Sequence, residues 1–252
     1  SEPQKATNFF EVATGNSIRT DAYIEEWLST LDNQPKTIDM KRSDLFRFAK
    51  AFPYSHLVDR KAVQQWLYQI QQEENIKNRT LARVVSPCRG YWDYLDRAGY
   101  LTIEADPFKD VVPKTPKGST VIYKYKRSFL LVNGLDRLLQ QARSNDDQEL
   151  WDFIWLAMWT GCRIEEIGSL TLDCVKADRF IIADAKSSAG DRVVPIHSRL
   201  VAAVERLSSM SKDGFLMSDL SLNKYDDRSN AVGKRFGRMK TKQGYDRSFV
   251  FH

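Results

Sequence analysis

The chain has few cysteines and no long apolar segment. Its three cysteines, Cys88, Cys162 and Cys174, are widely spaced. They are too few and too scattered for a disulfide framework or a cysteine-based zinc cluster, so we expect a reducing, intracellular setting. No uninterrupted apolar run reaches the roughly 18 residues that a membrane span requires. The first residues, SEPQKATNFF, lack the basic segment and apolar stretch of a secretory signal.

Positive charge is unevenly distributed along the chain. Residues 1–105 are balanced, with 14 basic and 14 acidic side chains, whereas residues 106–252 carry 24 basic and 19 acidic ones and so hold the whole net charge of +5. Two stretches are the most basic: 106–127, with six basic and two acidic residues, and 228–247, with seven and one. Such clusters are typical of surfaces that bind a polyanion, most simply nucleic acid. A merely solvated surface is the alternative.

Apolar residues recur at helical spacing through the first half of the chain. The pattern predicts four helices, near residues 21–33, 37–52, 59–72 and 78–101. We expect Asp21 and Asp59 to cap two of them, Gly99 to end the last, and Pro87 to kink or split it. The four make an all-α module over 18–105, preceded by an N-terminal tail at 1–17.

A proline- and lysine-rich segment, 106–120, interrupts this pattern and is interpreted as a stiff interdomain linker. Residues 121–252 then form a second domain, predicted to be mainly helical. Its sequence WDFIWLAMW predicts a buried central helix. The runs RFIIADA and DRVVPIH, separated by KSSAG, predict a β-hairpin. The fold class expected is therefore mainly α with a small antiparallel sheet, in two domains.

The motif TGCRIEEIGSL, residues 160–170, follows Trp159 and places one arginine between two apolar segments. Gly161 should close one helix, and Arg163 should lie in the first turn of the next. Unpaired backbone N–H groups and the positive end of the helix dipole favour an anion there. A guanidinium at that place suits phosphate, and Glu166 could orient it. The alternative is an ordinary surface pair of Arg163 with Glu165 or Glu166.

These features resemble the catalytic domain of the tyrosine recombinase, or phage integrase, family. TGCRIEEIGSL matches the pattern T-G-x-R-x-x-E-[IL]-x-x-L of the family's first box. Lys186 in the hairpin, followed by RVVPI, resembles the family's active-site lysine and its R-x-V-P-[IL] sequence. FVFH, ending at His252, resembles the start of the second box. NRTLARVVSPCRGYWDYLDRAGYLTIEADPF resembles the end of the core-binding domain, so the resemblance spans about residues 20–252.

The resemblance implies a four-helix, SAM-like core-binding domain, a mixed α/β catalytic domain, and a role for each matching residue. Arg163 would hold the non-bridging oxygens of the scissile phosphate, with Glu166 orienting it from behind. Lys186 would be the general acid for the leaving 5′ oxygen, and His252 would contact the phosphate and assist proton transfer. His197 is interpreted as structural. The implied reaction is transesterification through a 3′-phosphotyrosine, with no metal and no nucleotide cofactor.

The implied partners are double-stranded DNA with an inverted-repeat core site and other protomers in a DNA-bound tetramer. No membrane partner is expected, and the implied location is the cytoplasm of a bacterial or phage-infected cell. The family surrounds DNA with two domains and a linker, so basic residues along both domains are candidates for DNA contact. These DNA-binding candidates are Lys41, Arg42, Arg79, Thr80, Arg83, Lys114, Lys117, Lys124, Lys126, Arg127, Lys234, Arg235, Arg238 and Lys240.

One part of the family pattern is not found within these 252 residues. The resemblance requires a second arginine, a further His or Trp, and a nucleophilic tyrosine after the second-box histidine, whereas the last tyrosine here, Tyr245, precedes His252. We therefore expect residues 1–252 to bind DNA without cleaving it. Residues 1–17 are also too short for an arm-binding domain. The alternatives are a non-catalytic DNA-binding protein of the same fold and, less well supported, a type IB topoisomerase.

Overall fold

The structure, a computed structural model, describes residues 2–113, 132–183, 191–245, 249 and 251. The chain divides into two compact units, Ser1–Thr120 and Val121–His252. We call them the N-terminal unit and the C-terminal unit and describe each by itself. Both are mainly helical, and the sheet formed by the described residues is a small antiparallel one with two strands. The expected fold class is confirmed.

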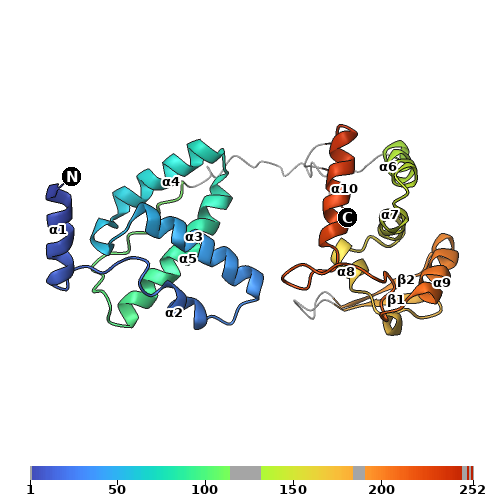
Figure 1. Ribbon diagram of the computed structural model, residues 1–252, viewed down its shortest axis with the longest axis horizontal. Coiled ribbons are helices and arrows are strands. Elements are labelled where there is room, and N and C mark those ends of the chain that lie inside the picture. Colours follow the sequence, from blue (N-terminus) through green and yellow to red (C-terminus); the bar gives the residue numbers. More distant parts are fainter. Residues whose placement is uncertain (1, 114–131, 184–190, 246–248, 250, 252) are drawn as a thin grey trace. The chain divides into compact units, whose positions relative to one another are not determined.

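The N-terminal unit contains the four expected helices, ended by residues close to those that the periodicity indicated. They are α2 (Ile24–Ser29), α3 (Pro35–Ala51), α4 (Arg60–Glu74) and α5 (Asn78–Arg97), with a short 3-10 turn, η1 (Ser55–Leu57), before α4. Helices α3 and α5 pack on each other at the centre of this unit (Figure 1). The segment taken as a tail, 1–17, in fact contains a further helix, α1 (Glu2–Ala13).

At the helix ends of this unit two sequence predictions are confirmed and one is wrong, and of the two alternatives for Pro87 splitting does not occur. Asp59 caps α4 by accepting a hydrogen bond from the Ala62 amide at 2.8 Å. Gly99, at φ +74°, follows the end of α5, and Pro87 lies inside α5 without splitting it. Asp21 does not cap α2, because its carboxylate instead pairs with Arg19 at 2.8 Å.

Aromatic side chains form the core of the N-terminal unit. Phe48 on α3 packs against Trp66, Trp92 and Phe108, with ring centroids 5.5 to 6.0 Å apart. Phe108 is only 1% exposed and Val111 is also buried. The expected linker therefore begins too early in our prediction, because residues 106–113 are held to the first unit by the burial of these two apolar side chains.

The C-terminal unit combines helices with the β-hairpin. Its elements are α6 (Val132–Ser144), α7 (Gln148–Thr160), α8 (Ile164–Gly168), η2 (Leu172–Cys174), β1 (Arg179–Ile182), β2 (Arg192–Pro195), η4 (Ser198–Leu200), α9 (Val201–Met210) and α10 (Asn230–Lys242). Strands β1 and β2 pair antiparallel, with Ile182 opposite Arg192, so the predicted hairpin is confirmed. The sequence between them that carries KSSAG lies outside the described residues.

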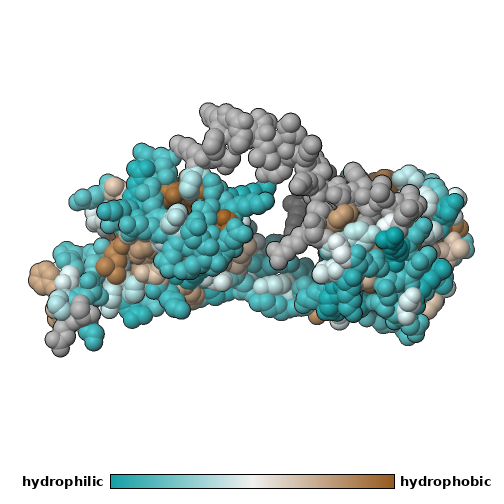
Figure 2. Space-filling model, turned by 90° about the horizontal axis from the view of Figure 1, so that it is seen from above, coloured by the Kyte–Doolittle hydropathy of each residue, from teal (hydrophilic) through white to brown (hydrophobic). Residues whose placement is uncertain are grey.

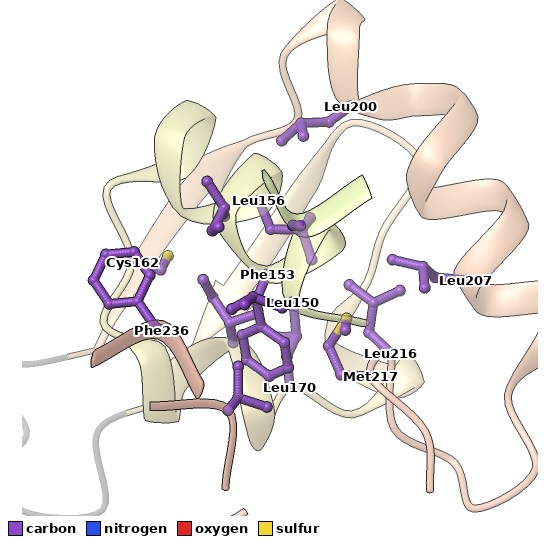
Figure 3. Close-up of a cluster of buried hydrophobic side chains, with 14 of the residues drawn as sticks. Leu150, Phe153, Leu156, Cys162, Leu170, Leu200, Leu207, Leu216, Met217 and Phe236 are labelled. Atoms are coloured by element: carbon purple, nitrogen blue, oxygen red, sulfur yellow. The ribbon is translucent and has the colours of Figure 1, made fainter. Parts of the chain in front are cut away.

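Helix α7 supplies the centre of this unit's core. Figure 3 shows Leu150, Phe153 and Leu156 of α7 together with buried side chains from the other elements, Leu170 and Phe236 among them. The predicted central helix is therefore found, with one side less buried than the rest. Its three tryptophans, at 151, 155 and 159, are half-buried along one side, where the rings of the first two stack at 5.2 Å.

Candidate phosphate-binding site

The TGCRIEEIGSL motif forms a tight turn between two helices. Gly161 ends α7 in the left-handed conformation, with φ +65°, which a residue without a Cβ adopts at little cost. Arg163 follows in extended conformation and is the N-cap of α8. Arg163 therefore lies just before the first turn of α8. The prediction that it lies within that turn is wrong by one position. The side chain of Arg163 is 64% exposed.

Glu166 binds Arg163 at two points. Its Oε2 accepts a hydrogen bond from the Arg163 backbone amide at 2.7 Å, and its Oε1 accepts one from Arg163 Nη1 at 2.8 Å. The first contact satisfies an amide that the start of the helix leaves unpaired. The second ties the guanidinium to a carboxylate whose side chain is only 9% exposed. The predicted orientation of Arg163 by Glu166 is therefore found in the geometry.

A second arginine completes this cluster. Arg192, the first residue of β2, donates from Nη1 to Glu166 Oε1 at 3.0 Å and from Nη2 to Glu166 Oε2 at 2.7 Å. Its Nη2 also lies 3.7 Å from the Cys162 sulfur. We refer to Arg163, Glu166 and Arg192 as the arginine–glutamate cluster. The motif RVVPI was noticed in the sequence, but no role was assigned to its arginine.

The cluster keeps its carboxylate ionised. Hydrogen bonds from Arg192, assisted by the Arg163 amide and the two positive charges, lower the pKa of Glu166 to about 2, although burial acts in the opposite direction. The same pairing raises the pKa of Arg192. A fixed negative charge thus separates two guanidinium groups, which would otherwise repel each other.

The adjacent acid, Glu165, binds different partners. Its Oε1 accepts from the Arg228 amide and its Oε2 from the Ser229 amide, both at 3.0 Å. These contacts hold the start of α10, where Ser229 is the N-cap. Glu165 is therefore not the partner of Arg163, and the consecutive glutamates of the motif connect α8 to two different parts of the unit.

Several predicted site residues cannot be placed. Lys186 and His252 lie outside the described residues, as do five candidates for DNA contact, namely Lys114, Lys117, Lys124, Lys126 and Arg127. His197, which we interpreted as structural, stacks on Trp159 at 4.3 Å, and its Nδ1 accepts from the Arg199 amide.

In the N-terminal unit, most candidate cations are engaged by neighbouring side chains. Arg42 pairs with Glu25 and Asp39, and Lys41 donates to Asn33 at 2.7 Å. Arg83 pairs with the largely buried Asp44 at 2.6 Å. The sequence did not show these ion pairs, because the partners come from other helices or other turns. Arg79 is exposed and Thr80 half-buried, on the same helix as Arg83.

In the C-terminal unit, the candidates lie on α10 and fall into two groups. Lys234 and Arg238 are exposed, four residues apart. Arg235 is tied to Asp147 at 2.9 Å and to Glu149, and Lys240 donates to the Phe249 carbonyl. Figure 2 shows that hydrophilic residues cover most of the face of each unit visible there.

Neither a metal site nor a membrane span is present in the part of the chain that the structure describes. No three His, Cys, Asp or Glu side chains group closely enough there to hold a metal ion. Among the helices of those residues, none is long and apolar enough to cross a bilayer.

Comparison with known proteins finds recombinases and integrases among the similar chains. No family model matches the chain. The tyrosine recombinase XerC of Pseudomonas savastanoi pv. phaseolicola is 25% identical over 196 residues, covering 73% of this chain and 61% of the relative. XerC of Oceanobacillus iheyensis is 26% identical over the same length, covering 73% and 60%. The chain is thus similar in sequence to tyrosine recombinases and in fold to integrases.

Solved structures of integrases share the fold. A lambda integrase dimer bound to a COC′ core site superposes with a TM-score of 0.70 at 13% identity, covering 97% of this chain and 69% of that one. The Tn1549 transposon integrase in complex with transposon right end DNA gives a TM-score of 0.64 at 16% identity, covering 93% and 83%. The chain spans about three fifths of the length of the curated XerC proteins that it matches.

Proposed function

We propose that this chain binds duplex DNA and supplies the first phosphate-binding arginine, Arg163, of a site-specific recombinase. One observation carries the proposal: Arg163 is mostly exposed, yet its amide and guanidinium are both held by one largely buried carboxylate. An exposed arginine normally samples many rotamers. Holding it in one direction suits a group that must meet a phosphate in a defined geometry.

In the proposed reaction, Arg163 donates to the non-bridging oxygens of the scissile phosphate. Negative charge on these oxygens grows as the pentavalent transition state forms, so a fixed guanidinium stabilises that state more than the ground state. Lys186 would protonate the leaving 5′ oxygen, and His252 would contact the phosphate and assist proton transfer. Attack of a tyrosine oxygen on the phosphorus would form the 3′-phosphotyrosine bond as the bond from phosphorus to the 5′ oxygen breaks. This link conserves the energy of the phosphodiester, so no metal or nucleotide cofactor is needed.

The names of the relatives support DNA and further protomers as partners. The solved integrases include a dimer on a core site and a tetramer on a Holliday junction. For this chain we propose double-stranded DNA with an inverted-repeat core site and assembly of several protomers on it. The basic residues of α10 and of 106–127 would contribute phosphate contacts.

The proposal is tested by measuring the affinity of the chain for a duplex of mixed sequence at several salt concentrations. The affinity should fall steeply with salt, and Arg163→Ala should weaken it about three- to tenfold. Arg137→Ala, which removes an exposed arginine of α6, is the matched control and should have little effect. A salt-independent affinity would contradict the proposal.

Cleavage is tested separately with a nicked suicide substrate. We propose that residues 1–252 by themselves form no covalent adduct, because Tyr245, the tyrosine nearest to the FVFH sequence, precedes that sequence, whereas the resemblance requires a tyrosine after it. A covalent protein–DNA adduct would show instead that a tyrosine within these residues acts as nucleophile. Binding without any adduct from a longer form of the protein would favour a non-catalytic DNA-binding protein of the same fold.

A further inference from the structure

We propose that Arg192 is a positioning residue that fixes the direction of Arg163 through Glu166. The inference rests on the proposed function, in which Arg163 meets the scissile phosphate. It adds a residue of strand β2 to the turn that holds Arg163 and Glu166. It also assigns a role to the arginine of RVVPI.

The geometry shows one carboxylate shared by four donors. Oε1 receives Arg163 Nη1 at 2.8 Å and Arg192 Nη1 at 3.0 Å. Oε2 receives the Arg163 amide and Arg192 Nη2, both at 2.7 Å. Arg192 therefore binds with both terminal nitrogens, one on each oxygen. This two-pronged contact fixes the plane of the carboxylate as well as its position.

Without Arg192, the donors to Glu166 described above would all belong to Arg163, the residue that Glu166 has to orient. Glu166 lies in a helix of five residues, Ile164–Gly168, which is far too short to be stable from its own hydrogen bonds. Its side chain has three rotatable bonds, and Arg163 is itself 64% exposed. A contact from a paired strand provides a reference point outside the helix, because Arg192 is aligned opposite Ile182 in the hairpin.

The arrangement also distinguishes the roles of the two arginines. Arg192 donates from both terminal nitrogens to Glu166 and its side chain is 38% exposed, whereas the side chain of Arg163 is 64% exposed. Arg163 thus has the geometry of a group that meets a ligand, and Arg192 that of its support. Both positive charges remain close together only because Glu166 stays ionised between them.

The proposal is tested first without DNA, by side-chain NMR. In the wild-type chain, rotation about the Nε–Cζ bond of Arg192 should be slow, and the Nε–Hε group of Arg163 should be ordered. Lysine keeps the charge of Arg192 but cannot make the two-pronged contact. Arg192→Lys should therefore lower the order of the Arg163 Nε–Hε group, while the backbone amide signals of the unit keep their chemical shifts.

Matched changes separate positioning from general damage. Arg179→Lys makes the same replacement in β1, where the arginine pairs with the exposed Asp178 at 3.5 Å, and should leave Arg163 unchanged. Glu166→Gln keeps the shape of the side chain and should loosen Arg163 as Arg192→Lys does. If Arg192→Lys unfolds the unit, the wild-type measurement decides, since fast rotation of Arg192 overturns the proposal without any variant.

DNA affinity provides the second measurement, as a double-mutant cycle. Arg192→Lys should weaken binding of mixed-sequence duplex about threefold, and it should add little once Arg163 is already alanine. Full additivity would overturn positioning through Arg163. If the wild-type chain binds no DNA, the proposed function fails, but the NMR result still decides whether Arg192 orients Arg163. An Arg163 that stays ordered in Arg192→Lys overturns the further inference alone.

Discussion

Asp44 in the N-terminal unit and Glu166 in the C-terminal unit are both largely buried carboxylates that bind arginine, and their pKa values shift in opposite directions. In the N-terminal unit, Asp44 is 10% exposed and pairs with Arg83. In the C-terminal unit, Glu166 is 9% exposed and pairs with Arg163 and Arg192. Burial raises the pKa of Asp44, and Arg83 opposes the rise only in part. The pKa of Glu166 falls to about 2.

The difference follows from the number of donors around each acid. Asp44 receives two hydrogen bonds from one guanidinium, at 2.6 and 3.4 Å. Glu166 receives four contacts of 3.0 Å or less, from two guanidinium groups and one backbone amide. The two side chains are about equally exposed, but desolvation is the largest influence on the pKa of Asp44, whereas the hydrogen bond from Arg192 is the largest at Glu166. The donors therefore outweigh the cost of removing the charge from water at Glu166 and not at Asp44.

The largest expected effect is on stability. Glu166→Ala should lower the free energy of unfolding of the C-terminal unit by about 3 kcal/mol, because it leaves two arginines and an amide without their shared partner. Asp44→Ala should cost the N-terminal unit only about 1 kcal/mol. Urea denaturation measures both, with hydrogen exchange assigning each transition to its unit. Glu205→Ala on the exposed side of α9 is the control; equal losses at Asp44 and Glu166 would contradict the comparison.

The next effect is the dependence of stability on pH. The pKa of Glu166 is lowered from 4.5 to about 2, so its stabilisation is complete above about pH 4.5 and is lost as the pH falls towards 2. The pKa of Asp44 is raised above 3.8, so its contribution declines as the pH rises from 3.8 through the folded value. Carboxyl ¹³C titration of the folded chain measures both values. If both titration midpoints were below, or both above, the ordinary pKa values of the two acids, the opposite pKa shifts would be refuted.

Removing one arginine from beside each acid should raise both pKa values, so that Glu166 moves towards its ordinary value while Asp44 moves further away from its own. Arg192→Ala removes the largest cause of the low pKa of Glu166 and should raise that pKa by about one unit or more. Arg83→Ala should raise the pKa of Asp44 still further above 3.8. The same titration measures these changes. An unchanged pKa of Glu166 in Arg192→Ala would show that the backbone amide and the guanidinium of Arg163 are enough to lower that pKa.

The smallest expected effect concerns DNA and rests on the proposed function. Arg79 and Arg83 lie one turn apart on α5, but Arg83 is tied to Asp44 while Arg79 is exposed. Arg79→Ala should weaken binding of mixed-sequence duplex about threefold, and Arg83→Ala less than twofold. Fluorescence anisotropy at fixed salt measures both. A larger loss at Arg83 would indicate that it exchanges Asp44 for a phosphate.

Prediction from sequence succeeded where the signal was local. The apolar spacing of Phe48, Val63 and Trp92 located their helices, and Gly161 ended α7 at the predicted place. It failed where distant segments decide. The burial of Phe108 assigned residues 106–113 to the first unit, against a linker composition. Asp21 had the right residue type for a cap but found Arg19 two residues away.

The sequence by itself determined the helical fold class, the hairpin and the TGCRIEEIGSL motif, since each depends on residues within a few turns of one another. Only the tertiary structure decided which partners the charged side chains take. Glu166 meets Arg192 across 26 residues, Glu165 meets Ser229 across 64, and Asp44 meets Arg83 across 39. Such pairs depend on how strands and helices pack, and packing is fixed by the burial of apolar side chains far from the charges themselves.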